Sequence, residues 1–372
     1  MYYKLSELFD LQMGKTPSRD NPAYWDSPQY AWISIADLTS AGKYITDTKE
    51  SLSALAVEES GIKVIPAQTV VMSFKLSIGK VAITPVPMYS NEAIMAFVDK
   101  GIVKIDPEYL YYLLLHRDWE EGTNKAVMGK TLNKATLSNV MISIHPYEEQ
   151  REIVLVLNKV STVIEEYKLE LRTLDQLIKA RFVEMFGKET EHRVPLKECC
   201  IDVRGGGTPS MQHPEYYGGN VPFIKSGDVR GDMVSSGALW LTDKALEETT
   251  AKYVPQGSVL VVNRSAALLR EFRAAIAACP VVINQDIKAF IPKHDYTSEY
   301  LLWAIKIQTQ LLLTKVTTVL TSHIDLKDLL ELRIANASIE RQKEFSAFIS
   351  QVDKSKVVEF SVFTKRAKSY II

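Results

Sequence analysis

The chain has 372 residues, of which 46% are hydrophobic and 24% are charged, and 44 Lys and Arg nearly balance 45 Asp and Glu, for a net charge of -1. This composition excludes a largely disordered chain and predicts a soluble protein of two or more packed domains. The near-zero charge also argues against a protein that coats nucleic acid over its whole surface, but it leaves room for local basic surfaces.

The sequence carries no recognisable membrane or export signal. The first residues, from Met1 to Glu7, lack the apolar run of a signal peptide, and no stretch approaches the ~18 uncharged apolar residues of a membrane-spanning helix. Three cysteines, Cys199, Cys200 and Cys279, are too few for a disulfide framework and fit a reducing compartment. We therefore expect a cytoplasmic protein with no membrane partner.

The first part of the chain mixes strands and helices. Residues 69–74 and 79–83 are rich in β-branched side chains and predict two strands joined by a short turn. Asp106, followed by a proline and a glutamate, has the sequence of a helix N-terminus. Residues 1–147 are therefore predicted to form the first domain.

A long helix is predicted next, because residues 148–186 contain neither proline nor glycine and Gly187 ends the run. Apolar side chains recur there at alternating steps of four and three, the heptad seam of a coiled coil. The residues of this seam are Ile153, Leu157, Val160, Ile164, Tyr167, Leu171, Leu174 and Ile178. A helix ~55–60 Å long cannot bury such a seam on one small domain, so it needs a partner helix.

The rest of the chain repeats the first part in the same order. Residues 16–18 (Thr-Pro-Ser) recur 192 residues later as residues 208–210, and Gln150 recurs 192 residues later as Gln342. Other matched segments keep nearly the same offset along the whole chain, which indicates two copies of one unit. The second domain is predicted over residues 188–338.

The second copy supplies the partner helix over residues 339–372, and residues 148–187 form the first spacer helix. In the second helix, residues 339–372, the apolar face consists of Phe345, Ile349 and Val352, although Lys356 interrupts the seam. We predict an α+β protein with two tandem α/β domains separated by long helices that pair as an antiparallel coiled coil. The alternative is two amphipathic helices that each pack on their own domain.

An antiparallel helix pair relates the two domains by an approximate two-fold axis. Duplex DNA has the same symmetry, and two readers ~45–60 Å apart would contact segments whose centres are roughly 13–18 base pairs apart. This geometry favours a DNA reader in which the helices set the distance between two contacted segments.

Two motifs carry a resemblance to a known family. Residues 206–210 read Gly-Gly-Thr-Pro-Ser, and residues 14–18 repeat this motif with Lys15 in place of the second glycine. Residues 146–150 read Pro-Tyr-Glu-Glu-Gln at the start of the long helix, and residues 338–342 match them without the proline. With these motifs, the sequence resembles the specificity (S) subunits of type I restriction-modification systems over nearly its whole length.

The resemblance implies that each copy is a target recognition domain followed by a conserved-region helix. The chain would then be a non-catalytic subunit that reads a bipartite target in double-stranded DNA. Its partners would be two methyltransferase (M) subunits, which alone would carry S-adenosylmethionine and methylate adenine. Motor-nuclease (R) subunits would join them to cut unmodified DNA.

Candidate DNA contacts lie in three kinds of segment: the Thr-Pro-Ser loops, the strand turns, and the loops that precede the long helices. They are Lys15, Thr16, Ser18, Arg19, Lys75, Lys80, Lys130, Asn133 and Lys134 in the first copy and Thr208, Ser210, Asn263, Arg264, Arg270, Arg273, Thr321, Ser322 and His323 in the second. Arginine can bind guanine through two hydrogen bonds, asparagine can bind adenine, and hydroxyls can bind phosphates. The alternative for each is a structural turn, a helix cap or a solvated side chain.

The sequence offers no complete enzymatic motif. Residues 21–24 (Asn-Pro-Ala-Tyr) lack the second proline of a methyltransferase loop, and residues 129–131 (Gly-Lys-Thr) lack the glycine that a phosphate loop needs at position 124. Adjacent Cys199 and Cys200 are poorly placed to share a zinc ion. We expect no catalytic residue, no metal and no cofactor on this chain. A coiled-coil scaffold that binds only proteins remains the alternative to a DNA specificity subunit.

Overall fold

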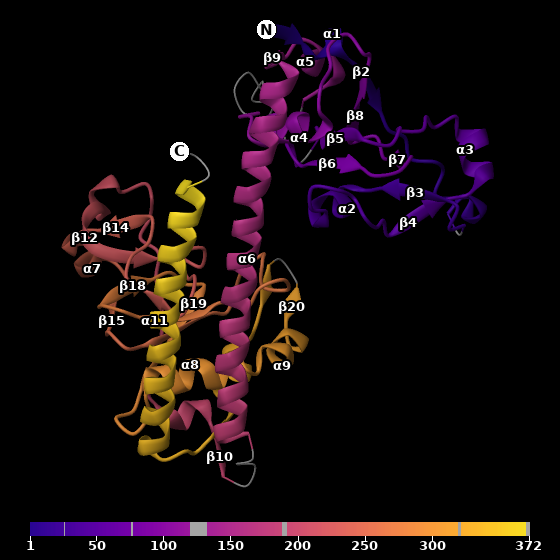
Figure 1. Ribbon diagram of the computed structural model, residues 1–372. Helices are drawn as coiled ribbons and strands as arrows, with labels where there is room; N and C mark the ends of the chain where they lie inside the picture. The colour runs from indigo at the N-terminus through magenta and orange to yellow at the C-terminus, as the bar shows by residue number, and fades with distance from the viewer. Residues whose placement is uncertain (26, 76, 120–131, 188–191, 319–320, 370–372) are drawn as a thin grey trace. The chain divides into compact units, whose positions relative to one another are not determined.

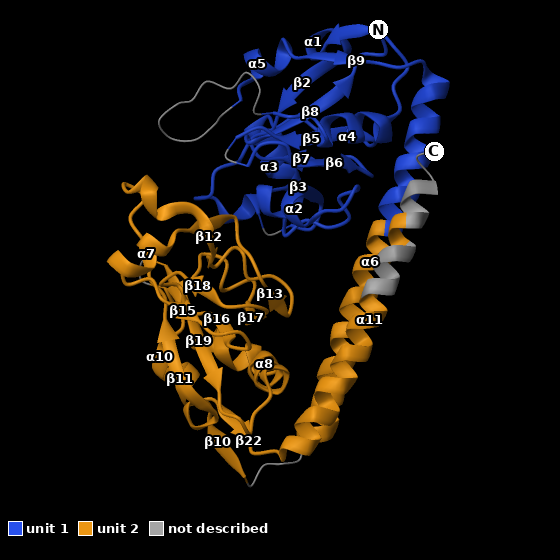
Figure 2. Cartoon of the chain, turned by 90° about the vertical axis from the view of Figure 1, so that its left-hand side faces the viewer, with its two compact units in different colours: residues 1–163, 367–372 blue, residues 164–366 orange. Residues whose placement is uncertain are grey.

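The computed structural model describes residues 1–25, 27–75, 77–119, 132–187, 192–318 and 321–369. Two compact units divide the chain: unit 1 comprises residues 1–163 and 367–372, and unit 2 comprises residues 164–366 (Figure 2). Each unit mixes helices and strands (Figure 1), so the fold class is α+β.

Unit 1 is built on a four-stranded antiparallel sheet. In spatial order its strands are β2 (Phe9–Met13), β8 (Ile94–Asp99), β5 (Thr69–Ser73) and β6 (Val81–Thr84). A second sheet has the order β4 (Glu50–Leu52), β3 (Tyr30–Ile33), β7 (Tyr89–Ser90), and β1 (Tyr2–Lys4) pairs with β9 (Met141–Ser143). The helices are α1 (Leu5–Leu8), α2 (Ile35–Ser40), α3 (Ala54–Ser60), α4 (Pro107–Leu115) and α5 (Lys134–Ser138).

Both faces of the unit 1 sheet are buried, which explains why its central strands lack polar alternation. Val70 and Met72 of β5 pack into one core together with α4, whereas Val71 packs into a second core on the opposite face. This alternation follows from the two-residue period of a strand. The predicted helix start is confirmed, because the Asp106 carboxylate accepts hydrogen bonds from the first turn of α4.

Unit 2 repeats this plan with a larger sheet. Its strands are, in spatial order, β11 (Cys200–Gly205), β19 (Ile287–Pro292), β16 (Val259–Val262), β17 (Ala274–Ala277) and β13 (Met233–Val234). The second sheet contains β14 (Leu239–Leu241), β12 (Tyr217–Ile224), β18 (Val281–Ile283) and β15 (Tyr253–Val254), and two strand pairs are β10 (Arg193–Pro195) with β22 (Arg333–Ala335) and β20 (Thr317–Thr318) with β21 (Ser322–His323). The short helices are α7 (Asp243–Glu248), α8 (Ser298–Lys306), α9 (Thr309–Thr314) and α10 (Leu326–Leu330).

Two long helices complete the chain. The first is α6, Tyr147–Phe186, which begins in unit 1 and ends in unit 2, and the second is α11, Ile339–Ser369. None of the helices in the described ranges is both long and apolar enough to cross a membrane.

Within unit 2, α6 and α11 lie side by side and run in opposite directions (Figure 2). The rings of Phe182 and Phe345 are 5.2 Å apart, and farther along the pair the rings of Tyr167 and Phe363 are 4.9 Å apart. Residue numbers therefore fall along α6 as they rise along α11. Ile178 and Phe182 of α6 share one core with Phe345 of α11 and with residues of the unit 2 sheet. The two helices therefore pack on each other and also on the rest of unit 2.

Candidate nucleic-acid interface

One end of the unit 1 sheet gathers all three kinds of candidate segment. Met13 pairs with Met95, Ser73 with Ile94, and Met72 with Val81, so β2 and β5 end where β8 and β6 begin. The Thr-Pro-Ser loop and the β5–β6 turn therefore leave the sheet at the same end. The segment before α5 joins them, because its residue 132 donates a backbone hydrogen bond of 3.2 Å to the carbonyl of residue 74.

The same three segments meet at the corresponding end of the unit 2 sheet. Gly205 pairs with Lys288, Val262 with Ile287, and Val261 with Ala274, so β11 and β16 end where β19 and β17 begin. The segment that leads to α10 joins them through backbone hydrogen bonds from residue 324 to residue 263 (2.8 Å) and from residue 265 to residue 322 (3.0 Å). We call these ends the loop edges.

In each unit, a glycine holds the Thr-Pro-Ser loop against the end of a strand of the second sheet, β7 in unit 1 and β18 in unit 2. A Cβ atom at Gly14 would lie 2.2 Å from the carbonyl oxygens of Ser90 and Asn91, and one at Gly206 would lie 2.1 Å from the carbonyl oxygen of Ile283. Side chains cannot approach backbone that closely, so both positions require glycine. The first glycine of the family motif thus has a structural role in both copies.

The threonine of the motif is used within the fold. The hydroxyl of Thr16 donates to the Glu92 carboxylate, and the hydroxyl of Thr208 donates to the Gln285 amide oxygen. The hydrogen bond from Thr16 is the largest of the effects that lower the pKa of Glu92. These matched bonds favour the structural alternative for both threonines.

The other candidate residues of the Thr-Pro-Ser loop in unit 1 differ in whether their side chains already have partners within the protein. Arg19 forms an ion pair with Glu50 and lies 3.7 Å over the ring of Trp25, so its guanidinium is already partnered. Lys15 donates to the carbonyl of Ser60. Ser18 is exposed, and its Oγ accepts a 3.3 Å hydrogen bond from a backbone amide.

The β5–β6 turn of unit 1 presents two lysines. Lys80 donates to the hydroxyl of Thr39, and the ammonium of Lys75 lies 5.3 Å over the ring of Phe74. In the next segment, the Asn133 side chain caps α5 by accepting a hydrogen bond of 2.8 Å from Thr136, whereas Lys134 is exposed. The capping alternative therefore describes Asn133. Lys130 lies outside the described residues.

The turn of unit 2 carries the arginines. Arg264 and Arg270 are exposed, and neither side chain has a hydrogen bond or ion pair within the described ranges. Arg273 instead pairs with Glu271 at 2.6 Å and donates to the carbonyl of Ser226 at 3.4 Å.

Asn263 is only 8% exposed, and its amide donates to the carbonyl of residue 324 at 3.3 Å. A buried side chain does not reach a base edge, so this placement favours a structural role for Asn263.

The last segment of unit 2 forms a small strand pair. Ser322 is 6% exposed, and its hydroxyl lies 3.3 Å from that of Thr318. His323 lies 3.6 Å from the Asp325 carboxylate, and Thr321 is exposed. Ser210, in the Thr-Pro-Ser loop, is also exposed. Among the candidates, the exposed charged side chains with no hydrogen bond or ion pair in the described ranges are thus Lys134, Arg264 and Arg270, and further exposed hydroxyls are those of Ser18, Ser210 and Thr321.

Two basic residues that are not among the predicted DNA contacts also lie at the unit 2 loop edge. Lys288 pairs with Gly205 at the start of β19, and Lys225 follows β12 directly, beside the turn of Asn284. Their positions in the repeat correspond to Met95 and Ser34, which are not basic. A basic residue whose counterpart in the other copy is uncharged is therefore the sequence signal that could have identified them.

The predicted seam residues lie on one long helix but contact different surroundings. Ile153 packs against the core of unit 1, whereas Leu174 and Ile178 pack into the core of unit 2 together with Ile349 and Val352. The intervening side chains are half-buried: Leu157, Val160, Ile164, Tyr167 and Leu171.

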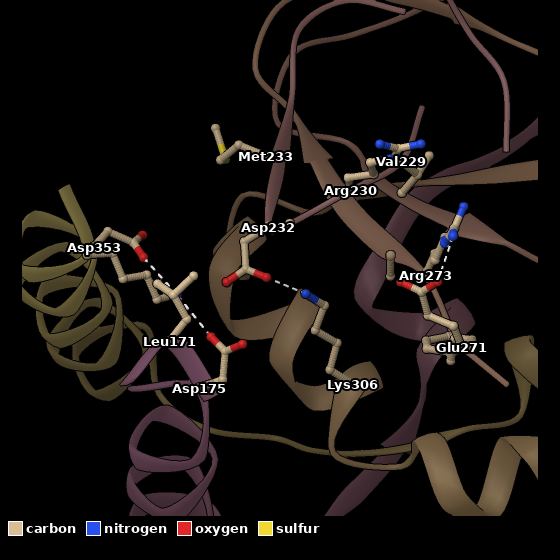
Figure 3. A pocket seen from close by; sticks show the side chains of 14 residues that line it. Leu171, Asp175, Val229, Arg230, Asp232, Met233, Glu271, Arg273, Lys306 and Asp353 are labelled. Carbon is tan, nitrogen blue, oxygen red and sulfur yellow. Dashed lines mark hydrogen bonds and ion pairs between the residues drawn. The ribbon is translucent and has the colours of Figure 1, made fainter. Parts of the chain in front are cut away.

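A charged pocket of about 570 Å³ lies in unit 2 beside the helix pair (Figure 3). Lys306 forms an ion pair with Asp232, and Lys356 forms ion pairs with Asp175 at 3.0 Å and with Asp353 at 3.3 Å. Lys306 and Lys356 thus each have a carboxylate partner, as does Arg273 of the lining, whereas Arg230 donates to the carbonyl of Gly227 at 3.1 Å.

The described residues contain no group of three or more His, Cys, Asp or Glu side chains that could hold a metal ion. Cys199 and Cys200 are buried free thiols, and burial raises their pKa to about 11 and about 12. Such thiols are protonated and unreactive at neutral pH.

The chain is thus a duplicated α+β protein in which each unit carries an equivalent loop edge and a long helix follows each copy. The family model described as "Type I restriction modification DNA specificity domain" matches residues 1–173 and again residues 192–359. The chain therefore belongs to this family, and the two separate matches agree with the internal repeat.

Named relatives agree with this assignment. The chain is 24% identical to the type I restriction enzyme MjaIX specificity subunit of Methanocaldococcus jannaschii over 73% of its own length and 68% of the relative's. It is also 24% identical to the EcoR124I/EcoR124II specificity subunit of Escherichia coli, over 66% of its own length and 63% of the relative's. The prediction of a specificity subunit, which is not itself the enzyme, is confirmed by these matches.

A solved structure shares the fold. It was described in work on complex assembly and conformational transition of the type I R-M system, and the match covers 100% of this chain and 95% of that one. The TM-score is 0.51 at 17% sequence identity, which supports the two-domain α+β architecture alone.

Proposed function

We propose that each unit of this specificity subunit reads one half of a bipartite target in double-stranded DNA. The observation that carries the proposal is the loop edge, where the same three segments come together in both units although their exposed side chains differ. Two domains that read different half-sites need equivalent backbone segments that carry different exposed side chains. The target recognition domains are residues 1–147 and 188–338.

Residues 148–187 and 339–372 serve as spacer helices that pair as an antiparallel coiled coil and set the gap between the half-sites. The opposed contacts of α6 and α11 within unit 2 support this pairing. Insertion of two helical turns after Val160, matched by an insertion after Val352, lengthens the preferred gap by roughly three base pairs. An unchanged gap contradicts the spacer role.

The helices also dock two methyltransferase subunits, which carry S-adenosylmethionine, and motor-nuclease subunits join that complex. Exposed apolar side chains on α6 support a docking role, because Leu169, Leu177 and Val183 are 63%, 48% and 55% exposed. A docked subunit would cover these apolar groups. The complex acts on DNA in the cytoplasm.

Selection of bound duplexes from a random DNA library tests the proposal. The chain and its methyltransferase subunits should enrich a sequence of two fixed segments separated by unspecified bases. Affinity should fall steeply as salt rises, because phosphate contacts release counterions. Enrichment of no sequence, together with salt-independent assembly, would instead favour the coiled-coil scaffold.

A further inference from the structure

Each long helix is joined to its unit by a buried glutamine. Gln150 and Gln342 are both 0% exposed, although glutamine is seldom fully buried. They lie at equivalent positions of the repeat, in the first turns of α6 and α11. A buried amide is tolerated only where its hydrogen-bonding groups are satisfied.

The two glutamines make the same three hydrogen bonds. In unit 1, Oε1 of Gln150 accepts from the backbone N–H of Asp106 at 2.9 Å, and Nε2 donates to the carbonyls of Lys104 at 3.1 Å and His145 at 2.9 Å. In unit 2, Oε1 of Gln342 likewise accepts from the backbone N–H of Thr297 at 2.9 Å.

Nε2 of Gln342 donates to the carbonyls of Asp295 at 3.1 Å and Ala337 at 2.9 Å. Asp106 and Thr297 are the N-cap residues of α4 and α8, the helices that pack on the two large sheets. Each glutamine therefore ties the start of a long helix to the start of the helix that covers the sheet. We call this arrangement the glutamine clamp.

A second polar link follows on each long helix. In unit 1, Asn158 donates to the carboxylate of Glu108 at 2.7 Å. In unit 2, Ser346 donates to the carboxylate of Glu299 at 3.2 Å, and Glu299 is the repeat equivalent of Glu108. Two attachment points on one helix restrict rotation of the sheet about the clamp.

The clamp lies at the end of each sheet opposite the loop edge. In unit 1, β8 begins at the loop edge with Ile94 and ends with Asp99, and a small cavity of about 230 Å³ is lined by both Asp99 and Pro107 of α4. In unit 2, β19 likewise starts at the loop edge, and its end leads into α8.

Because the clamp and the loop edge lie at opposite ends of the sheet, a small tilt of the sheet at the clamp produces a larger displacement of the loop edge. A strand of six residues is roughly 20 Å long, so a tilt of ~10° at the clamp moves the loop edge by ~3.5 Å. That displacement equals about one base-pair step of ~3.4 Å. A small increase in the range of angles between the sheet and the long helix is therefore enough to let the subunit accept gap lengths that differ by one base pair.

We infer that Gln150 and Gln342 are positioning residues that set how strictly the subunit discriminates the gap length of its DNA target. The inference rests on the proposed function, since it presupposes a bipartite target. Neither glutamine touches DNA, so the bases preferred within each half-site are independent of the clamp.

The test compares duplexes that carry both half-sites at the preferred gap and at gaps one base pair shorter or longer. The full chain with its methyltransferase subunits is used as wild type, Gln150→Met and Gln342→Met. Methionine matches the length of glutamine but makes none of the three hydrogen bonds. Leu38→Ala, which loosens the unit 1 core away from the clamp, controls for general destabilisation.

The expected result is a fall of about tenfold in the affinity ratio between the preferred and altered gaps in each methionine variant, with base preferences unchanged. Leu38→Ala should keep the wild-type ratio. Wild-type ratios in both methionine variants, or an equal fall in Leu38→Ala, would overturn the inference. A wild-type protein that shows no gap preference would instead overturn the proposed function. Should Gln150→Met not fold, Gln150→Glu replaces it, because its carboxylate still accepts from Asp106.

Discussion

Lys356 of α11 pairs with Asp175 of α6, with Nζ and Oδ1 3.0 Å apart, at a seam position that is apolar in the first copy. Burial opposes the charge of Lys356, yet the hydrogen bond and the charges of Asp175, Asp232 and Asp353 raise its pKa. The lysine is therefore charged at neutral pH. A charged residue in a helix seam favours one register over its neighbours, at some loss of stability.

The Lys356–Asp175 pair predicts an interaction free energy of about 1 kcal/mol between these side chains. The value is modest because Asp175 is 53% exposed and solvent screens the pair. A double-mutant cycle with Lys356→Met and Asp175→Asn, read from urea unfolding, measures it. Strictly additive effects of the two substitutions would show that the pair contributes nothing to the register.

Gly14→Ala and Gly206→Ala are each expected to destabilise the protein by about 1–3 kcal/mol, because the added methyl group overlaps backbone oxygens. Each substitution should also weaken DNA binding at one half-site only, since the Thr-Pro-Ser loop of one unit is displaced. Gly42→Ala and Gly227→Ala are matched controls, because no atom lies within 4 Å of the added carbon. Thermal unfolding and binding to half-site variants provide the two readouts.

Arg264→Ala is expected to reduce discrimination at one base pair of the second half-site by about 1–3 kcal/mol if its guanidinium binds a guanine. If it binds phosphate, affinity falls for all sequences and the salt dependence loses roughly one unit of slope. Arg333→Ala, an exposed arginine on β22 at a distance from the loop edge, serves as the control. Equal losses at both half-sites would contradict the division of labour between the units.

Cys199 and Cys200 are expected to resist alkylation in the native protein at pH 8, whereas Cys279, which is only partly buried, should react. All three should react in denaturant, and mass spectrometry locates the labels. Since burial raises both folded pKa values above the unfolded value of about 9, the two thiols stabilise the fold below pH 9 and lose this effect as pH rises toward 11–12. Ready labelling of either residue in the native state would contradict the buried core that α6 and α11 share with unit 2.

Much of the architecture follows from local pattern. The 40-residue helix α6 was predictable from its unbroken heptad seam, and α4 from the cap at Asp106. The strands around Val71 were predictable because β-branched residues are concentrated there. Each of these signals lies within a short window of sequence, where backbone propensity and side-chain period act directly.

The loop edge was only partly predictable, because it depends on pairing between distant strands. Sequence spacing brought Thr16 and Asn263 forward as DNA contacts, but the fold uses the hydroxyl of one and buries the amide of the other. Gln150 was visible only as a repeated residue, since its three partners lie 5 to 46 positions away in the sequence. Long-range partners of this kind are specified by the packed fold and not by local pattern.

Genome-wide mapping of methylated adenines tests the central claim most directly. Cells would carry the methyltransferase subunits with either the wild-type chain or a chain whose unit 1 loop, residues 15–19, is replaced by another sequence. The wild type should yield a motif of two fixed segments separated by unspecified bases, and the replacement should change one segment while leaving the other and the gap intact. A single contiguous motif, or a change in both segments, would contradict the assignment of one half-site to each unit.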